Sequence, residues 1–354
     1  LGQVGQDPFF IVLAPYAPHA PATPDAPDTA LFSDYVYRGR SYHESDLSDK
    51  PYWVANPNAF SVLKNPDDEF HRDMLRSLQS VDRSIGDIHD MLAQLGKLDN
   101  TVIIFTSDNG FLWGEHSITE KGNAYEESLL VPLVMAGPGI PVTTDSEHLV
   151  SPDLDVAATV IDMAGIDRPQ ADGLSLTPLF GQGNVDWRDV LVHQSWGRHP
   201  GAYGVWSAIS NGRWKFIDNP NGVTDELYDL QNDPFEEENQ IKNSAHSAIK
   251  NSLAQMLAEN RGVSTTVFDA PGGKVGERYS FTLSAWGGTP PYKWSIYNGR
   301  LPAGLSLSQS GVISGIPTEA GSKTFKLKVV SQATATQSGT IQRHVEDFTI
   351  VIDP

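Results

Sequence analysis

The sequence predicts an α/β domain, followed by a small antiparallel α+β part and a C-terminal β-sandwich. Short apolar runs of strand length alternate with a long amphipathic stretch in the first half of the chain. Aromatic-rich segments of alternating polarity follow from about residue 186, and the last part, about 85 residues, consists of short runs broken by Gly and Pro. The 354 residues suffice for two or three domains.

Strand and helix signals alternate in the first domain. Residues 9–15 form an apolar run ended by proline, which predicts a buried strand leading into an extended loop. Residues 67–95 carry apolar side chains at three- and four-residue spacing and predict a long helix that Gly96 ends. Residues 101–110 (TVIIFTSDNG) predict a second buried strand. Strand, helix and strand in this order favour a parallel sheet.

Further elements follow in order. Residues 131–140 predict a third strand, and Ser151, followed by proline, begins a helix that Gly165 ends. Residues 204–217 predict two antiparallel strands joined by an Asn-Gly turn, and a last helix covers about residues 245–260. The expected organisation is, in chain order, an α/β portion at 1–185, a small antiparallel subdomain at 186–262, a linker at 263–275 and a β-sandwich at 276–354 with Trp294 in its core.

Composition excludes several classes of protein. The chain has no cysteine, so disulfides, thiolate-bound metals and cysteine nucleophiles are absent. No window approaches the roughly 18 apolar residues of a membrane-spanning helix, and the first residues lack a signal-peptide pattern. The net charge of -19 is uneven: residues 1–262 hold 17 Lys+Arg against 38 Asp+Glu, and residues 263–354 hold 8 against 6. We therefore expect no nucleic-acid partner and no membrane insertion, although an acidic surface also serves solubility alone.

Polar side chains near the ends of the predicted strands are candidates for chemistry. His19 lies in the loop after the first apolar run, and Asp108 and Asn109 directly follow the second. The carboxyl ends of parallel strands meet at one edge of a sheet, so these side chains are expected in one crevice. Carboxylate and carboxamide oxygens suit Ca²⁺ or Mg²⁺. SDNG is equally typical of a turn, and His19 or Lys121 alone is typical of a surface, so both interpretations stay open.

A series of motifs resembles a known family. The stretches are APYAPHAP around His19, RSYHESDLSDKPYWV (40–54), TSDNG (106–110), GEH (114–116), Lys121, YEES (125–128), GPGI (137–140), DGLSL (172–176) and ELYDLQNDPFEEENQI (226–241). Over about residues 8–260 they resemble the formylglycine-dependent sulfatases of the alkaline-phosphatase superfamily, and among these the N-acetylglucosamine-6-sulfatases. The resemblance implies the C-terminal part of a mostly parallel sulfatase sheet sandwiched by helices.

The resemblance implies a calcium-dependent sulfuric ester hydrolase that acts on sulfated carbohydrates, including glycosaminoglycans, in the periplasm or outside the cell. It implies that Asp108 and Asn109 bind the calcium ion. It also implies that Lys121 contacts the sulfate and its bridging oxygen, and that His19 faces the leaving group. Such cations stabilise the nonbridging oxygens of a sulfate ester, and an imidazole or ammonium group can protonate the leaving oxygen.

The resemblance also raises two further candidate residues, and one motif of the family is missing from the sequence. Trp113 and His116 lie between the metal pair and Lys121, where they line the substrate pocket or serve as structural loop residues. The family makes its formylglycine nucleophile from the Cys or Ser of a C-x-P-x-R motif, and neither form occurs in the 354 residues. The two N-terminal aspartates that complete the calcium site are also missing. We therefore expect a chain truncated at its N-terminus, or a natural inactive or split protein, without sulfatase activity of its own.

The C-terminal region has a resemblance of its own. The stretches WGGTPPYKWSI (286–296) and GVISGIPTEAG (311–321) resemble the immunoglobulin-like domain appended to many bacterial extracellular proteins. Such a module is expected to contact a polysaccharide or cell surface, or to act as a spacer. Two alternatives remain for the whole chain: a phosphatase or phosphonate hydrolase of the same superfamily, and a non-catalytic surface protein. Two-metal phosphatases typically carry Asp-His where this chain has Asp108 and Asn109.

Overall fold

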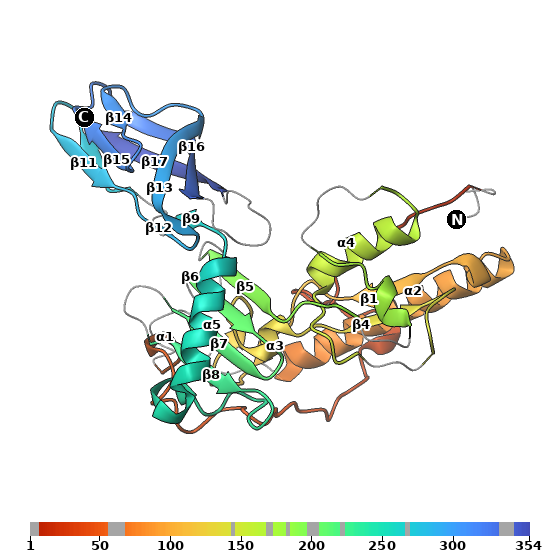
Figure 1. The fold of residues 1–354 in the computed structure, drawn as a ribbon. Coiled ribbons are helices and arrows are strands. Elements are labelled where there is room, and N and C mark those ends of the chain that lie inside the picture. The colour runs from red at the N-terminus through yellow and green to blue at the C-terminus, as the bar shows by residue number, and fades with distance from the viewer. Residues whose placement is uncertain are drawn as a thin grey trace. The chain divides into compact units, whose positions relative to one another are not determined.

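The computed structural model describes residues 7–55, 68–142, 146–167, 173–181, 185–196, 205–219, 224–265, 270–332 and 343–354 (Figure 1). Contacts divide the chain into two units. The first unit comprises Leu1–Ser48, Trp53–Lys121 and Tyr125–Asp189. The second comprises Asp49–Tyr52, Gly122–Ala124 and Val190–Pro354. None of the described helices has both the length and the apolar character needed to cross a membrane.

The elements up to residue 180 form two small ladders and several helices. In chain order they are η1 (Ala26–Asp28), α1 (Tyr52–Ala55), α2 (Asp68–Gln94), η2 (Leu98–Asn100), β1 (Ile103–Thr106), β2 (Leu112–Trp113), β3 (Thr119–Glu120), α3 (Glu126–Leu129), β4 (Leu133–Ala136), α4 (Pro152–Met163) and η3 (Thr177–Phe180). Strand β1 pairs antiparallel with β4, and β2 pairs antiparallel with β3. Helix α4 follows Ser151 and is followed by Gly165 at φ +64°, as predicted.

Helix α2 confirms the predicted long amphipathic helix. Its first turn carries Asp68 and Glu69, which suits the positive end of the helix dipole. Gly96 adopts φ +64°, and the N–H of Lys97 donates to the carbonyl of Leu92 at 2.9 Å. This 6→1 hydrogen bond over a left-handed residue is the Schellman end of a helix, and it explains why the helix stops before Gly96.

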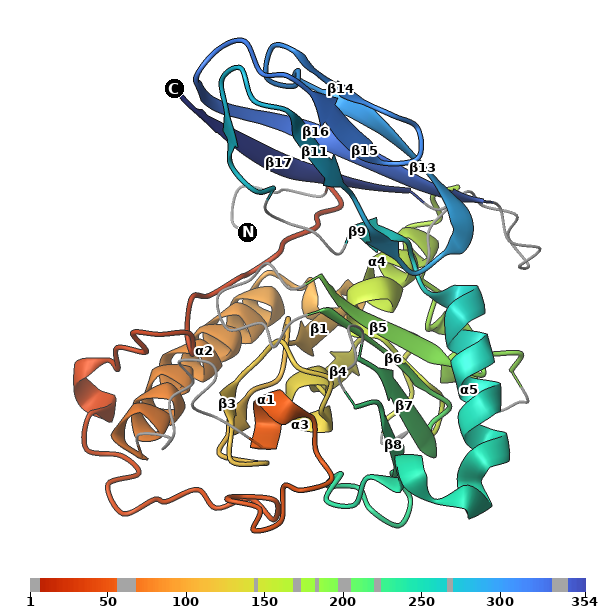
Figure 2. The ribbon, with the colours of Figure 1, turned by 90° about the vertical axis from the view of Figure 1, so that its left-hand side faces the viewer.

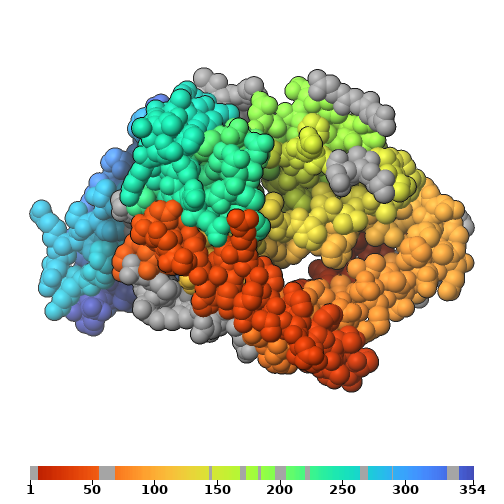
Figure 3. All heavy atoms as spheres, turned by 90° about the horizontal axis from the view of Figure 1, so that it is seen from below, coloured from red at the N-terminus to blue at the C-terminus, as the bar shows by residue number. Residues whose placement is uncertain are grey.

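Arginines of α2 hold the preceding segment on the helix. Figure 3 shows the segment before residue 50, in red-orange, as a surface strip beside the orange α2. The tethers are Arg72 Nη1 to Tyr35 O at 3.0 Å, Arg76 Nε to Leu31 O at 2.8 Å, Arg83 Nη2 to Asp28 Oδ2 at 2.6 Å, and Arg38 Nη1 to Asp68 Oδ1 at 2.8 Å. A segment with little regular structure is thus positioned by hydrogen bonds with one helix.

The structure corrects the strand predicted at residues 9–15. This run is coil, and Phe10 and Val12 are 71% and 73% exposed. It pairs with no strand among the described residues, and an unpaired strand leaves its backbone donors and acceptors unsatisfied. An apolar run without a neighbouring strand therefore lacks the ladder that would make it a strand.

The described strands of the first unit also differ from the buried, parallel strands expected. Strand β1 pairs antiparallel with β4, and the burial of both is partial, with Val134 60% exposed. The chain between them carries the β2–β3 hairpin and the one-turn helix α3 instead of a crossover helix. A parallel pair needs such a crossover, so this connection returns the chain in the opposite direction.

The second unit begins with an antiparallel sheet covered by a helix (Figure 2). Its elements are β5 (Leu191–Trp196), β6 (Val205–Ser210), β7 (Trp214–Asp218), β8 (Glu226–Asp229), η4 (Gln240–Lys242), η5 (Ser244–His246) and α5 (Ser247–Asn260). The four strands pair in sequence order, and Leu253 and Leu257 of α5 pack on Ile209 and Phe216. The predicted Asn-Gly turn joins β6 to β7, with Gly212 at φ +86°.

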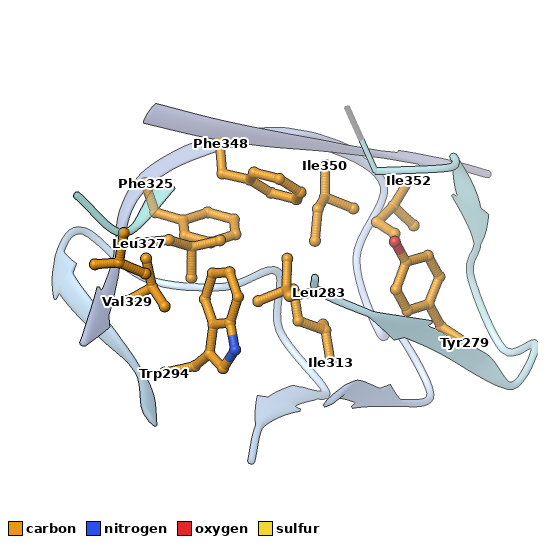
Figure 4. Packing of buried hydrophobic residues seen from close by; sticks show 11 residues of the cluster. Tyr279, Leu283, Trp294, Ile313, Phe325, Leu327, Val329, Phe348, Ile350 and Ile352 are labelled. Atoms are coloured by element: carbon orange, nitrogen blue, oxygen red, sulfur yellow. The ribbon is translucent and has the colours of Figure 1, made fainter. Parts of the chain in front are cut away.

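The C-terminal sandwich packs two sheets face to face (Figure 4). Its strands are β9 (Ser264–Thr265), β10 (Gly273–Lys274), β11 (Tyr279–Thr282), β12 (Ala285–Trp286), β13 (Thr289–Asn298), β14 (Leu305–Leu307), β15 (Val312–Gly315), β16 (Gly321–Gln332) and β17 (Arg343–Asp353). One sheet has the order β10-β17-β16-β13, and the other has the order β11-β15-β14. Trp294 is buried in the core, as predicted. Strands β9 and β10 lie within the predicted linker, so parts of that linker pair with strands of the sandwich.

We expect Phe348→Ala to destabilise the sandwich selectively. Phe348 is fully buried, and its ring centroid lies 5.9 Å from that of Phe325. Loss of a buried Phe side chain costs about 3–5 kcal/mol of unfolding free energy. Differential scanning calorimetry should show this loss, whereas Val351→Ala on the same strand, at a side chain 48% exposed, should change stability by less than about 0.5 kcal/mol. Equal losses in the two variants would contradict the described packing.

Candidate functional site

A short hairpin brings two of the predicted site residues together. Asn109 lies before β2, and Lys121 directly follows β3. Leu112 pairs with Glu120 in the antiparallel ladder, so the chain before the hairpin lies beside the chain after it. Lys121 Nζ donates a hydrogen bond of 2.8 Å to Asn109 Oδ1. The geometry of the hairpin thus accounts for a contact between residues twelve positions apart.

The glycine of SDNG is required by a close backbone approach. The N–H of Gly110 donates to the carbonyl of Ser128 at 3.0 Å. A Cβ at position 110 would lie 2.1 Å from the carbonyl oxygen of Glu127, closer than any side chain tolerates. Ser107 Oγ also donates to the carbonyl of Asn109 at 3.0 Å. The SDNG segment thus bends at Asp108, and the hydrogen bond of Gly110 holds its backbone against α3.

Two carboxylates approach one another at this edge of the β1–β4 ladder. Asp108 is exposed after β1, and Asp153 lies in the first turn of α4. Burial raises the pKa of Asp153, and the negative charge of Asp108 raises it further. Asp108 and Asp153 thus add negative charge to an edge where Lys121 supplies an ammonium group.

The donor atoms at this edge suit a hard cation. Asp108 and Asn109 supply a carboxylate and a carboxamide oxygen, which are the ligand types of Ca²⁺. Calcium takes about six to eight oxygen ligands. Within the described ranges, no three His, Asp or Glu side chains converge as a metal site. The residues thus fit a calcium ion in donor chemistry and would supply only part of its coordination shell.

His116 is fully buried in the loop between β2 and β3. Its Nδ1 lies 2.8 Å from Glu44 Oε2, and its Nε2 lies 3.8 Å from Glu127 Oε2. The ring stacks on Tyr125 with the centroids 4.1 Å apart. His116 also has φ +52°, a left-handed conformation that costs energy in a non-glycine residue. This placement favours the structural alternative over contact with a substrate.

The loop that holds His116 contacts the stretch around Ser41 and Glu44, whose residues had no individual role in the sequence-based prediction. The N–H of His116 donates to the carbonyl of Ser41 at 3.0 Å, and the backbone N–H of Trp113 donates to Glu115 Oε2 at 2.5 Å. Burial raises the pKa of Tyr37, and a hydrogen bond to Glu115 raises it further. Glu44 and Glu115 both lie in motif stretches of the sequence, and that membership is the signal by which they could have been found.

Trp113 anchors the hairpin to α2. Its indole stacks on His71 of α2, with the centroids 4.2 Å apart and an interplanar angle of 14°, and also contacts Phe70. Burial lowers the pKa of His71, which favours the neutral form of the stacked imidazole. The indole is half-buried, so one part of it packs on α2 and another stays accessible. Its predicted contact with a substrate stays a prediction.

His19 lies in an exposed turn after the coil segment. Its Nδ1 lies 3.0 Å from the carbonyl oxygen of Ala20, and its ring centroid lies 5.0 Å from that of Tyr16. These contacts are local and do not connect His19 to Asn109 or Lys121. The structure therefore joins Asn109 to Lys121 directly, places Asp108 beside them, and leaves the predicted role of His19 untested.

Three family models match the chain. One described as Sulfatase matches residues 1–166, and one described as N-sulphoglucosamine sulphohydrolase, C-terminal, matches residues 114–262. The third, described as Putative Ig domain, matches residues 263–350. The two sulfatase models overlap over residues 114–166, so β3 and Lys121 are common to both.

Curated relatives are similar to the same region. N-acetylglucosamine-6-O-sulfatase of Bacteroides thetaiotaomicron is 29% identical over 236 residues, which are 65% of this chain and 40% of that protein. Human N-acetylglucosamine-6-sulfatase is 36% identical over 203 residues, 54% of this chain and 36% of that protein. The arylsulfatase of Volvox carteri is 32% identical over 269 residues, 64% and 40% respectively. The chain thus spans about 40% of the length of these relatives.

Solved structures share the fold. A 2-O GAG sulfatase has a TM-score of 0.55 at 24% identity, over 63% of this chain and 51% of that one. A phosphonate monoester hydrolase from Silicibacter pomeroyi has a TM-score of 0.54 at 22% identity, over 68% and 53%. Both sulfate ester and phosphonate hydrolases thus use this fold, so the fold alone does not decide between them.

We expect Glu44→Ala to destabilise the first unit. Glu44 is 6% exposed and its partner His116 is fully buried, so the substitution leaves a buried imidazole without this acceptor. Removing one partner of a buried pair costs about 3 kcal/mol or more of unfolding free energy. Urea denaturation followed by tryptophan fluorescence measures the loss. Asp90→Ala, which removes the exposed partner of His89, should cost less than about 1 kcal/mol, and equal losses would contradict the buried pair.

Proposed function

This chain belongs to the sulfatase family over residues 1–262, and on that premise we propose that it forms part of a hydrolase of sulfated carbohydrates. The observation that carries the proposal is the hydrogen bond between Lys121 Nζ and Asn109 Oδ1, which places an ammonium group beside oxygen ligands suited to a divalent cation. The relatives named N-acetylglucosamine-6-sulfatases support a 6-sulfated amino sugar as the substrate.

Lys121 is proposed to bind the sulfate group. A sulfate ester is an anion, and its cleavage places negative charge on the departing oxygen. The ammonium group has three donors, so one can stay on Asn109 Oδ1 while others donate to a nonbridging and to the bridging oxygen. His19 is exposed and is proposed to donate a proton to the leaving oxygen. Residues 1–262 have a charge of -21, so such local cations supply the attraction for an anionic substrate.

Asp108 and Asn109 are proposed to hold a calcium ion. When bound, the ion neutralises negative charge on the sulfate oxygens. The sequence contains no C-x-P-x-R motif or serine form of it, so we assign the formylglycine nucleophile and the remaining calcium ligands to polypeptide outside these 354 residues. The chain would then be a fragment of the active enzyme.

Asn109 supports a sulfatase over the phosphatase alternative. A zinc-dependent phosphatase of this superfamily would use a histidine ligand at this position, whereas an amide oxygen suits calcium. The second alternative, a non-catalytic surface protein, rests on the C-terminal module alone. We propose that this module contacts a polysaccharide or a cell surface and that the protein works in the periplasm or outside the cell.

The purified 354-residue chain should not hydrolyse an aryl sulfate in the presence of calcium, because no formylglycine precursor occurs in its sequence. Release of 4-nitrocatechol from its sulfate is the measurement, and turnover above the buffer rate would refute the fragment proposal.

The product of the complete gene should hydrolyse the aryl sulfate faster than an aryl phosphate. The reverse preference would favour the phosphatase alternative.

In that complete protein, Lys121→Ala should lower kcat/KM for the aryl sulfate by about 100-fold or more, because one donor to the developing charge is lost.

Asp108→Ala in the complete protein should abolish calcium binding in isothermal titration calorimetry, since it removes a charged ligand. Asp82→Ala removes an exposed carboxylate of α2 and should change neither quantity. Retained calcium binding in the Asp108 variant would show that this residue is not a ligand.

A further inference from the structure

The C-terminal sandwich has one sheet whose two faces differ in chemistry. Along β16, the side chains of Phe325, Leu327 and Val329 point into the core, as Figure 4 shows. Successive side chains of a strand point to opposite faces, so Thr324, Lys326, Lys328 and Val330 lie on the outer face. The sequence of β16 thus separates an apolar inner face from a cationic outer face.

Neighbouring strands extend the charge across the outer face. Val330 pairs with Lys293 of β13 on one side and with Arg343 of β17 on the other, and directly opposed residues share a face. Lys293 and Arg343 are both exposed. We call Lys293, Lys326, Lys328 and Arg343 the cationic face.

An acidic side chain lies among the residues of the cationic face. Asp347 is opposite Lys326, and their side chains form an ion pair of 3.1 Å in which both groups are exposed. An exposed pair of this kind is weak and gives way to a competing anion. Asp353 and Lys274 are opposite one another at the far end of the same outer face. Counted with them, the described strands of this face carry five cations against two carboxylates, a net positive charge in a chain whose total charge is -19.

Several polar side chains and one aromatic side chain of this sheet suit a carbohydrate. Thr324 and Thr349 lie side by side with their hydroxyl oxygens 2.9 Å apart. Ser295 lies opposite Lys328, and the ring of Tyr297 on β13 is exposed. Hydroxyls hydrogen-bond sugar hydroxyls, and an exposed aromatic ring packs on the C–H face of a sugar ring. A lone aromatic ring is no stacking series for nucleic-acid bases.

We propose that the cationic face binds a sulfated polysaccharide chain. Lys and Arg side chains donate charge-assisted hydrogen bonds to sulfate oxygens. Adjacent strands lie about 4.8 Å apart, and alternate residues of one strand lie about 6.7 Å apart, so the four cations can contact several sulfate groups of one polymer. The choice of a sulfated polymer over other anions rests on the proposed function. The module would then bind the substrate polymer on the same polypeptide as the candidate site.

Affinity electrophoresis of the full chain in gels with dextran sulfate tests this proposal. We expect retardation by dextran sulfate and none by unsulfated dextran, with the retardation lost at high salt. The triple variant Lys293→Gln, Lys328→Gln, Arg343→Gln should raise the apparent Kd by about tenfold or more. The matched control Arg278→Gln, Arg300→Gln, Lys323→Gln removes three exposed cations of the same module and should change Kd by less than about twofold. Lys323 is three positions from Lys326 on β16, so its side chain points to the opposite side of the strand.

Several outcomes would overturn the proposal. Equal weakening in the two triple variants, with unchanged circular dichroism, would mean that binding follows net charge and not this face. Equal retardation by unsulfated dextran would exclude recognition of sulfate. Tighter binding to a DNA oligonucleotide or to phosphatidylserine vesicles at the same salt would assign the face to another polyanion. The assay involves no ester cleavage, so its failure leaves the proposed hydrolase intact, and failed hydrolysis leaves this binding intact.

Discussion

The β2–β3 hairpin is the constraint on which the candidate site depends. It turns the chain back so that Lys121 reaches Asn109, and it does so around a loop with a buried imidazole at its centre. Glu44 holds that imidazole from one side and the ring of Tyr125 covers it from another. The position of Lys121 therefore follows from packing beneath the hairpin as much as from its own contacts.

Charge is distributed so that an anionic ligand has few places to bind. Residues 1–262 are strongly acidic, and within them Lys121 provides an ammonium group beside Asn109 of the SDNG segment. The sandwich has a slight excess of basic residues, and the alternation of β16 gathers part of that excess on one face. Both proposals invoke the same ligand chemistry, a sulfate ester on a sugar, and each rests on residues of a single unit.

Local sequence patterns predicted the elements whose shape is local. The periodicity of residues 67–95 with Gly96 after it gave α2 and its end, and the Asn-Gly pair gave the turn from β6 to β7. The same reasoning was wrong for residues 9–15, because an apolar run says nothing about whether a neighbouring strand is present. It also overestimated the burial of β1, which depends on what covers the strand.

The sequence by itself determined the motifs, the uneven charge and the alternation that divides β16 into two faces, because all three are properties of residues close together in the chain. Only the tertiary structure decided that β1 and β4 run antiparallel, that Asn109 accepts from Lys121, and that His116 is buried against Glu44. Strand direction and burial depend on contacts between residues far apart in sequence. For the same reason, Glu44 acquired a role only when its distance to His116 was known.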